Sequence, residues 1–130
     1  MKRKKAKGKS IEKKVKNMKE NSLLGRTFDF SVNIVLFLRT LPYNDELKII
    51  KYQLVKSVTS VAANYEESQG ASSKADFNNK IRIVLREARE SNYWLRLIAA
   101  IGYNSEDLNK LLQESKELKN IFVAILLKGK

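Results

Sequence analysis

The chain has 130 residues, a formal net charge of +12, and neither cysteine nor histidine. This length is enough for one domain with a core of its own. The absence of cysteine excludes disulfides, thiolate nucleophiles and cysteine-ligated zinc, and the absence of histidine removes the commonest general base and metal ligand. We therefore expect a binding protein rather than an enzyme, with no cofactor and no metal.

The positive charge is concentrated near the N-terminus. Residues 1–20 contain ten Lys or Arg against Glu12 and Glu20, a net charge of +8. Such a segment repels itself, so we expect 1–20 to be a flexible basic tail and 21–130 to be the folded domain. The phosphates of nucleic acid are its natural partners, while an anionic membrane surface and a simple gain in solubility are alternatives. The candidate phosphate-binding residues of the basic tail are Lys2, Arg3, Lys4, Lys5, Lys7, Lys9, Lys13 and Lys14.

Membrane and export signals are missing from the sequence. No apolar run approaches the roughly 20 residues that a membrane span requires. The basic start is not followed by the apolar stretch of a secretory signal. We expect a soluble cytoplasmic protein that has no membrane partner.

Residues 23–41 are expected to form the first helix, which Pro42 ends. This helix has two apolar stripes, roughly 110° apart around its axis. The first contains Leu24, Phe28, Val35 and Leu38, and the second contains Phe30, Ile34, Phe37 and Leu41. Since a four-helix monomer needs only one buried face, we assign the second stripe to an oligomer interface, with a wide core-facing surface as the alternative.

Residues 45–68 are expected to form the second helix, capped by Asn44 or Asp45 and followed by Gly70. Its core-facing seam contains Leu47, Ile50, Leu54, Val58, Val61 and Tyr65. A polar row lies beside this seam, and small polar side chains can form hydrogen bonds across a helix pair. We predict a polar inter-helix network, with an ordinary exposed face as the alternative, made by Ser57, Ser60, Asn64, Glu67, Glu87 and Glu90.

Residues 76–103 are expected to form the third helix, begun by Ser73 or Asp76 and closed by Gly102. Its seam contains Phe77, Ile81, Val84, Ala88, Ser91, Leu95 and Ile98. An arginine stripe lies roughly 150° from this seam, and it consists of Arg82, Arg86, Arg89, Tyr93 and Arg96. The stripe is a candidate nucleic-acid-binding surface; the alternative is a solvated helix back, with Arg86 paired to Glu90 and Arg82 to Glu87.

The fourth helix is expected to begin at Ser105, followed by the acidic residues that a helix N-terminus favours. Its seam contains Leu108, Leu111, Ser115, Leu118, Phe122 and Ile125. Four amphipathic segments joined by short turns, with no strand-like alternation, predict an all-α antiparallel up-and-down four-helix bundle. A di-iron site in such a bundle takes a Glu-x-x-His pair from each of two helices, which this chain cannot supply.

Two segments of the chain resemble a known family. They are Lys56–Glu67, KSVTSVAANYEE, and Leu85–Leu97, LREARESNYWLRL, with Asp76 and Phe77 between them. Over about residues 23–127, the chain resembles the four-helix-bundle proteins encoded in intervening sequences of bacterial 23S ribosomal RNA genes. This resemblance implies a homopentameric ring with no established catalytic residue. The relatives include the accessory variability determinant of diversity-generating retroelements, a basic pentamer that binds nucleic acid and the element's reverse transcriptase.

We therefore expect a non-enzymatic homo-oligomer that binds nucleic acid, RNA rather than DNA. The basic tail and the arginine stripe would contact phosphates, and Tyr93 could stack on an unpaired base. The alternative is an accessory scaffold of a retroelement, which recruits a reverse transcriptase and its template RNA.

Overall fold

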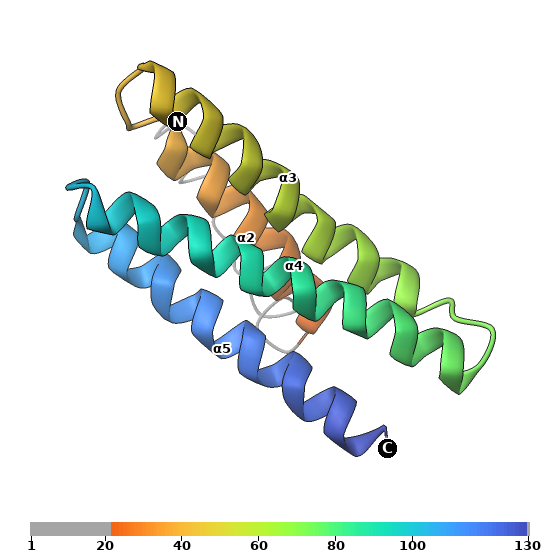
Figure 1. The fold of residues 1–130 in the computed structure, drawn as a ribbon. Helices are drawn as coiled ribbons and strands as arrows, with labels where there is room; N and C mark the ends of the chain where they lie inside the picture. The colour runs from red at the N-terminus through yellow and green to blue at the C-terminus, as the bar shows by residue number, and fades with distance from the viewer. Residues whose placement is uncertain (1–21, 130) are drawn as a thin grey trace, which may run out of the picture.

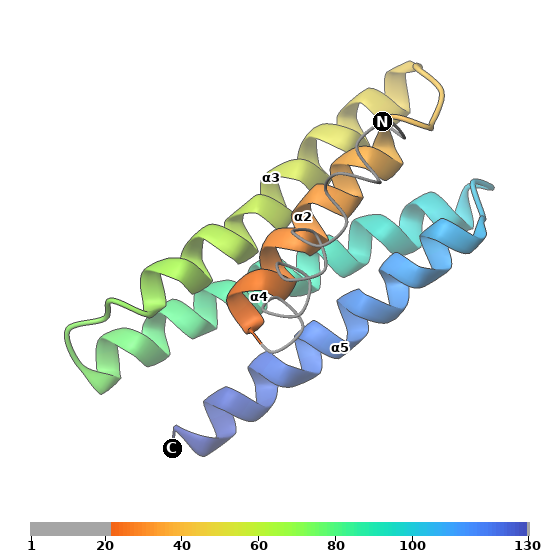
Figure 2. The same ribbon diagram turned by 180° about the vertical axis from the view of Figure 1, so that it is seen from behind.

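The computed structural model describes residues 22–129. These residues form four helices: α2 (Leu23–Leu38), α3 (Asp45–Ser68), α4 (Lys74–Ala100) and α5 (Glu106–Lys128). Successive helices run in opposite directions, and each packs on two others, so that α2 closes the bundle against α5 (Figures 1 and 2). The predicted all-α up-and-down four-helix bundle is confirmed. None of these four helices combines the length and the apolarity needed to cross a membrane.

Each helix begins at a side chain that accepts a hydrogen bond from the backbone N–H three residues later. The four capping residues are Ser22, Asn44, Ser73 and Ser105, at 3.2, 2.9, 3.0 and 3.1 Å. Such a cap satisfies one of the N–H groups that have no partner within the helix, and its loss costs about 1 kcal/mol. The caps at Asn44, Ser73 and Ser105 were all among the predicted ones, and because Ser73 is the cap of α4, this helix begins at Lys74, two residues before the predicted range.

Gly70 and Gly102, which follow α3 and α4, differ in conformation. Gly102 has a φ of +113°, and its N–H donates to the carbonyl of Ala99 at 3.1 Å while the N–H of Tyr103 donates to that of Ile98 at 3.2 Å. This pair of bonds is a Schellman motif, which requires a left-handed residue. Gly70 follows α3 without a positive φ, so only Gly102 needs to be glycine for this reason.

The predicted seams of α3, α4 and α5 form the core. Nearly all of their members are buried, while Tyr65, Phe77 and Ile125 lie partly buried against the same cluster. Tyr65 packs its ring on that of Phe122, with 5.8 Å between the ring centroids. The core-facing seams predicted for these three helices are therefore confirmed.

The structure corrects the assignment of the second apolar stripe of α2. Phe30, Ile34 and Phe37 are only 3%, 0% and 7% exposed, and Leu41 packs against the same core. The prediction that these four residues form an oligomer interface is wrong, because they are occupied inside one chain. The solvent-facing residues are instead an outer row at successive turns, which consists of Leu24, Phe28, Val32 and Leu36.

Two polar anchors explain this orientation of α2. On one flank, Arg26 forms an ion pair with Glu114 of α5 at 2.6 Å. On the other flank, the Ser31 hydroxyl donates to the carbonyl of Val58 in α3 at 3.2 Å. At 100° per residue, the direction midway between Arg26 and Ser31 is that of Ile34. The two anchors therefore turn the second stripe inward, although both stripes are apolar enough to be buried.

Candidate nucleic-acid interface

The arginine stripe lies on the outer face of α4, opposite its buried seam. All five of its members, Arg82, Arg86, Arg89, Tyr93 and Arg96, are exposed. Because α4 is the longest helix, with 27 residues, the stripe has a straight and rigid support. It spans about 21 Å from the first arginine to the last at 1.5 Å per residue.

Most guanidiniums of this stripe keep their charge unneutralised. Arg82 donates to Asn79 Oδ1 and Arg96 to Asn92 Oδ1, both at 2.8 Å. An amide oxygen orients a guanidinium but does not cancel its charge. Arg89 makes no hydrogen bond or ion pair with any other residue in the range 22–129. The stripe is thus a preoriented set of cationic groups.

The ion pairs expected for a solvated helix back do not form. Arg86 instead contacts the adjacent Glu87, with 3.5 Å between Nη2 and Oε2. Glu90 accepts a hydrogen bond from the indole of Trp94 at 3.1 Å. Of these two contacts, only the one between Arg86 and Glu87 neutralises an arginine of the stripe.

Tyr93 provides an aromatic surface within the stripe. Its side chain is 47% exposed, and its ring meets the edge of Trp94 with 4.9 Å between centroids and 74° between planes. The guanidinium of Arg96 lies 5.9 Å from the Tyr93 ring centroid. These contacts hold the ring in place, and a partly exposed held ring can stack on an unpaired base.

Two lysines of α5 extend this basic surface, and sequence analysis did not identify them. Ser115 accepts a hydrogen bond from Asn92 of α4 at 3.1 Å, which marks the side of α5 that adjoins α4. Lys119 follows Ser115 by one helical turn, and the exposed Lys116 lies beside it. The spacing of Lys116 and Lys119 in the sequence shows that they share one side of α5. Only the structure shows that this side adjoins α4.

The polar inter-helix network is smaller than predicted. Ser57 of α3 and Ser91 of α4 are 1% and 0% exposed, and their hydroxyl oxygens lie 2.9 Å apart. Asn64 donates only to Ser60, one turn earlier in its own helix, at 2.9 Å. The prediction is therefore right for Ser57 and wrong for a network of six.

The three glutamates of that prediction have separate partners. Glu67 lies 3.8 Å from Lys80, across the α3–α4 contact. Glu87 and Glu90 bind Arg86 and Trp94, as described above. Glu67 is exposed, whereas Glu87 and Glu90 are partly buried, and each carboxylate has a partner of its own. Within residues 22–129, no group of three acidic side chains is placed to hold a metal ion.

The junction between α2 and α5 is fastened by one arginine. Arg26 donates from Nε to Glu114 Oε2 at 3.0 Å and from Nη2 to Oε1 at 2.6 Å, and it also reaches Glu117 at 2.9 Å. The hydrogen bond to Glu114 is the main reason that the pKa of Arg26 is raised. Hydrogen bonds from Gln113 and then Arg26 lower the pKa of Glu117. Paired guanidinium and carboxylate groups of this geometry are the stronger class of ion pair.

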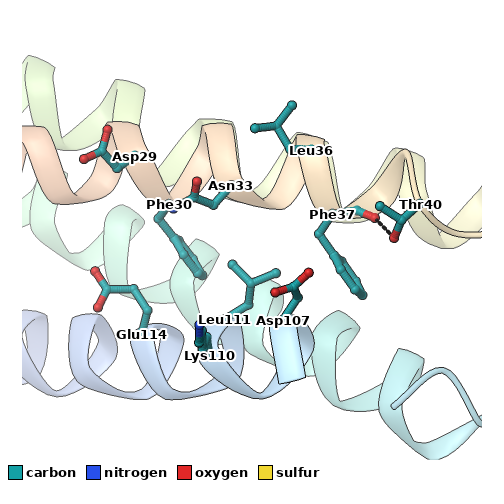
Figure 3. Close-up of a pocket in the computed structure, with 10 residues that line it drawn as sticks. All are labelled: Asp29, Phe30, Asn33, Leu36, Phe37, Thr40, Asp107, Lys110, Leu111 and Glu114. Carbon is teal, nitrogen blue, oxygen red and sulfur yellow. Dashed lines mark hydrogen bonds between the residues drawn. The ribbon is translucent and has the colours of Figure 1, made fainter. Parts of the chain in front are cut away.

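A groove of about 550 Å³ opens beside this junction, between α2 and α5 (Figure 3). Its lining residues are Asp29, Phe30, Asn33, Leu36, Phe37, Thr40, Asp107, Lys110, Leu111 and Glu114. The sequence did not predict it, because its two walls are distant in the chain. The candidate phosphate-binding residues of the basic tail, from Lys2 to Lys14, lie outside the described residues.

The fold and this surface define a small antiparallel four-helix bundle with one basic outer face. Residues 19–124 match the family model of the 23S rRNA-intervening sequence protein. The match covers most of the chain, so the protein belongs to this family, which confirms the resemblance found in the sequence. The resemblance to accessory variability determinant proteins remains a prediction.

A solved structure is similar over nearly the whole bundle. It is the 1.70 Å crystal structure of a protein with unknown function from the S23 ribosomal protein family of Bacteroides thetaiotaomicron VPI-5482. The two sequences are 29% identical, the similarity covers 81% of this chain and 98% of the other, and the TM-score is 0.72. No curated protein gives a significant match.

Proposed function

We propose that this protein is a non-enzymatic homo-oligomer that binds the phosphate backbone of RNA through the arginine stripe and the basic tail. The observation that carries the proposal is the exposure of four arginines along one face of α4, of which only Arg86 has a carboxylate partner within residues 22–129. Unpaired guanidiniums on a rigid helix can release counterions from a nucleic acid without first breaking ion pairs of their own. The proposal thus rests on charge that the fold itself leaves unsatisfied.

RNA is preferred to DNA as the ligand for two reasons. The partly exposed ring of Tyr93 can stack on an unpaired base, and unpaired bases are the usual targets of RNA recognition. The family description refers to a 23S rRNA-intervening sequence. A hairpin RNA with a single-stranded loop is therefore the first ligand to test.

Self-association is supported by the outer row of α2. Leu24, Phe28, Val32 and Leu36 are 40%, 57%, 39% and 49% exposed at four successive turns. On the adjoining α3, Tyr52 is also exposed, at 65%. A second copy of the chain is the occupant we propose, because the burial of this surface would also bring several arginine stripes into one assembly. The homopentameric symmetry that we expect rests on the family resemblance alone.

The test is a fluorescence anisotropy titration of a labelled RNA hairpin between about 50 and about 200 mM salt. The variant Arg82→Glu/Arg86→Glu/Arg89→Glu should weaken binding and reduce the slope of log affinity against log salt by about 2 to 3. The matched control is Arg39→Glu/Lys48→Glu/Lys56→Glu, which makes the same charge change at exposed positions at the end of α2 and along α3. Equal weakening by both variants would show that the effect comes from net charge alone. Unchanged binding by the α4 variant would exclude α4 as the binding surface.

The retroelement scaffold remains the second candidate, and the outer row of α2 is the observation that favours it. An apolar row can bind another protein as readily as a second copy. RNA binding measured with and without the protein partner distinguishes the two functions. Tight binding of the hairpin by this protein alone supports the first, whereas weak, non-specific binding that becomes tight only with a reverse transcriptase supports the scaffold.

A further inference from the structure

The groove between α2 and α5 combines an apolar floor with an acidic rim. Figure 3 shows the rings of Phe30 and Phe37 pointing from α2 toward α5, where Leu111 points back toward them. The carboxylates of Asp107 and Glu114 rise from α5 beside this floor. Three of the lining residues are acidic, and Lys110 is the one basic residue among them. The groove is thus suited to a ligand that is apolar on one side and cationic on the other.

We infer that this groove is the docking site of the protein's own basic tail. Within residues 1–20, the apolar residues Ile11, Val15 and Met18 recur at steps of four and three, which places them on one helical face. Lysines surround them in the sequence, and the segment has a net charge of +8. The lysines fit the acidic rim, and the apolar face fits over the narrow strip of floor that Phe30, Phe37 and Leu111 leave exposed, at 3%, 7% and 7% of their surfaces.

The length and attachment of the basic tail allow this contact. The tail is joined through Asn21 to Ser22, which caps α2, and the groove extends along α2 from Asp29 and ends at Thr40, just after the helix. Thr40 is about 27 Å from Ser22 at the helical rise, and twenty residues reach about 30 Å as a helix or about 66 Å when extended. The tail needs only to reverse its direction next to Ser22 in order to lie along the groove.

Tethering favours the tail of the same chain over other cationic ligands. A short covalent connection gives a local concentration of the order of millimolar, so weak contacts with an open groove are enough. Asp107 pairs with no cation within residues 22–129, while Glu114 is shared with Arg26. The rim therefore has at least one carboxylate available to a lysine, and its charge repels phosphate.

A docked tail would also regulate the surface described above. Lysines held against the rim would be withdrawn from nucleic acid, so RNA and the groove would compete for the tail. This consequence rests on the proposed function, whereas docking itself does not. The competition would raise the selectivity of the protein, because only a ligand that also engages the arginine stripe would release the tail.

Paramagnetic relaxation in the full chain tests the docking. The sequence has no cysteine, so Ser10→Cys provides a single attachment point for a nitroxide. The amide signals of Asn33, Thr40 and Lys110 should be broadened, while those of Arg82 and Arg89 should not. Broadening spread evenly over the bundle, or absent from the groove, would overturn the inference.

A matched pair of charge reversals tests the role of the rim. Asp107 and Glu46 are each the second residue of a helix and both are exposed, so Asp107→Lys and Glu46→Lys make the same change at a helix N-terminus. Asp107→Lys should reduce the relaxation rate at Asn33 by about two- to fivefold, and Glu46→Lys should leave it unchanged. If Asp107→Lys lowers helicity, Asp107→Asn replaces it and should reduce the relaxation rate at Asn33 by a smaller factor. Equal effects of the two reversals would contradict docking in the groove.

Two further arms separate the possible occupants and the two proposals. Mixing spin-labelled ¹⁴N chains with ¹⁵N chains that carry no spin label should leave the groove amides of the ¹⁵N chains unbroadened. Broadening of these amides in the mixture would assign the groove to the tail of a second copy and overturn docking within one chain. Adding the RNA hairpin should relieve the broadening. RNA binding without broadening of the groove amides would leave the proposed function intact and overturn docking. Broadening of the groove amides without RNA binding would support docking and overturn the proposed function.

Discussion

Helices α2 and α4 both present a row of side chains to solvent, but the two rows are chemically opposite. The outer face of α4 is a line of guanidiniums, and its inner face is apolar. The outer row of α2 is apolar, like its inner face. Burying the outer face of α4 would require several charges to lose their water, which has a large free-energy cost. Polarity alone orients α4, whereas α2 is oriented by the specific bonds of Arg26 and Ser31.

The largest expected effect distinguishes the two faces of α2. Phe30→Ala should lower the free energy of unfolding by about 3–5 kcal/mol, because it leaves a cavity in the core. Phe28→Ala, a matched truncation in the outer row, should change it by about 0.5 kcal/mol or less. Urea denaturation of both variants measures the difference. Similar losses at the two positions would contradict the inward orientation of the second stripe.

The second prediction makes the same comparison on α4. Ser91 is fully buried where α3 approaches, so Ser91→Leu should overpack this contact and destabilise the protein by about 1–3 kcal/mol. Arg89→Leu places the same side chain on the exposed face, where the effect should stay within about 0.5 kcal/mol. Denaturation midpoints would report the contrast, and a tolerated leucine at position 91 would refute close packing there.

The third prediction concerns how the two helices end. Gly102, after α4, has a φ of +113°, and Gly102→Ala should cost about 1–2 kcal/mol because a Cβ disfavours the left-handed conformation. The control is Gly70→Ala, where an added Cβ meets only the carbonyl oxygen of Glu67 at 3.8 Å. That variant should be neutral or more stable by about 0.4–1 kcal/mol. Thermal unfolding of the pair decides the matter, and a neutral Gly102→Ala would speak against the Schellman motif.

The smallest expected effect is the dependence on acid pH of the junction between α2 and α5. Folding lowers the pKa of Glu117 below its ordinary value of 4.5. Its contribution to stability is therefore present above that value and is lost as the pH falls through the lowered pKa. Arg26→Met removes one cause of the shift, so the thermal midpoint of this variant should fall less steeply below about pH 4.5 than that of the parent protein. Parallel curves would show that Arg26 does not contribute to this dependence.

The features that sequence could predict are those decided within one helix. The seams of α3, α4 and α5 follow from periodicity, and the caps at Asn44, Ser73 and Ser105 follow from residue type. The features that could not be predicted depend on pairs distant in the chain. Glu114, which orients α2, lies 88 residues from Arg26.

The candidate site follows the same division. The arginine stripe was visible because all its members belong to one helix, and the structure places each of them at the surface. Lys116 and Lys119 were missed because their proximity to it depends on the contact between α4 and α5. Ser57 was recognised as a polar residue beside a seam, but its partner Ser91 could only be identified once the two helices were in register.

The closure of the bundle by α2 on α5 has a consequence for how the protein folds and opens. The other neighbouring helices are consecutive in the chain, so their contacts form early and at small entropic cost, as in other rapidly folding bundles. α2 is the shortest of the four helices in residues 22–129, with 16 residues, and packs less extensively on α5 than on α3. We expect its amides to exchange with solvent hydrogen through a partial opening that leaves α3, α4 and α5 together, with Arg26 and Glu114 as the latch that sets how often this opening occurs.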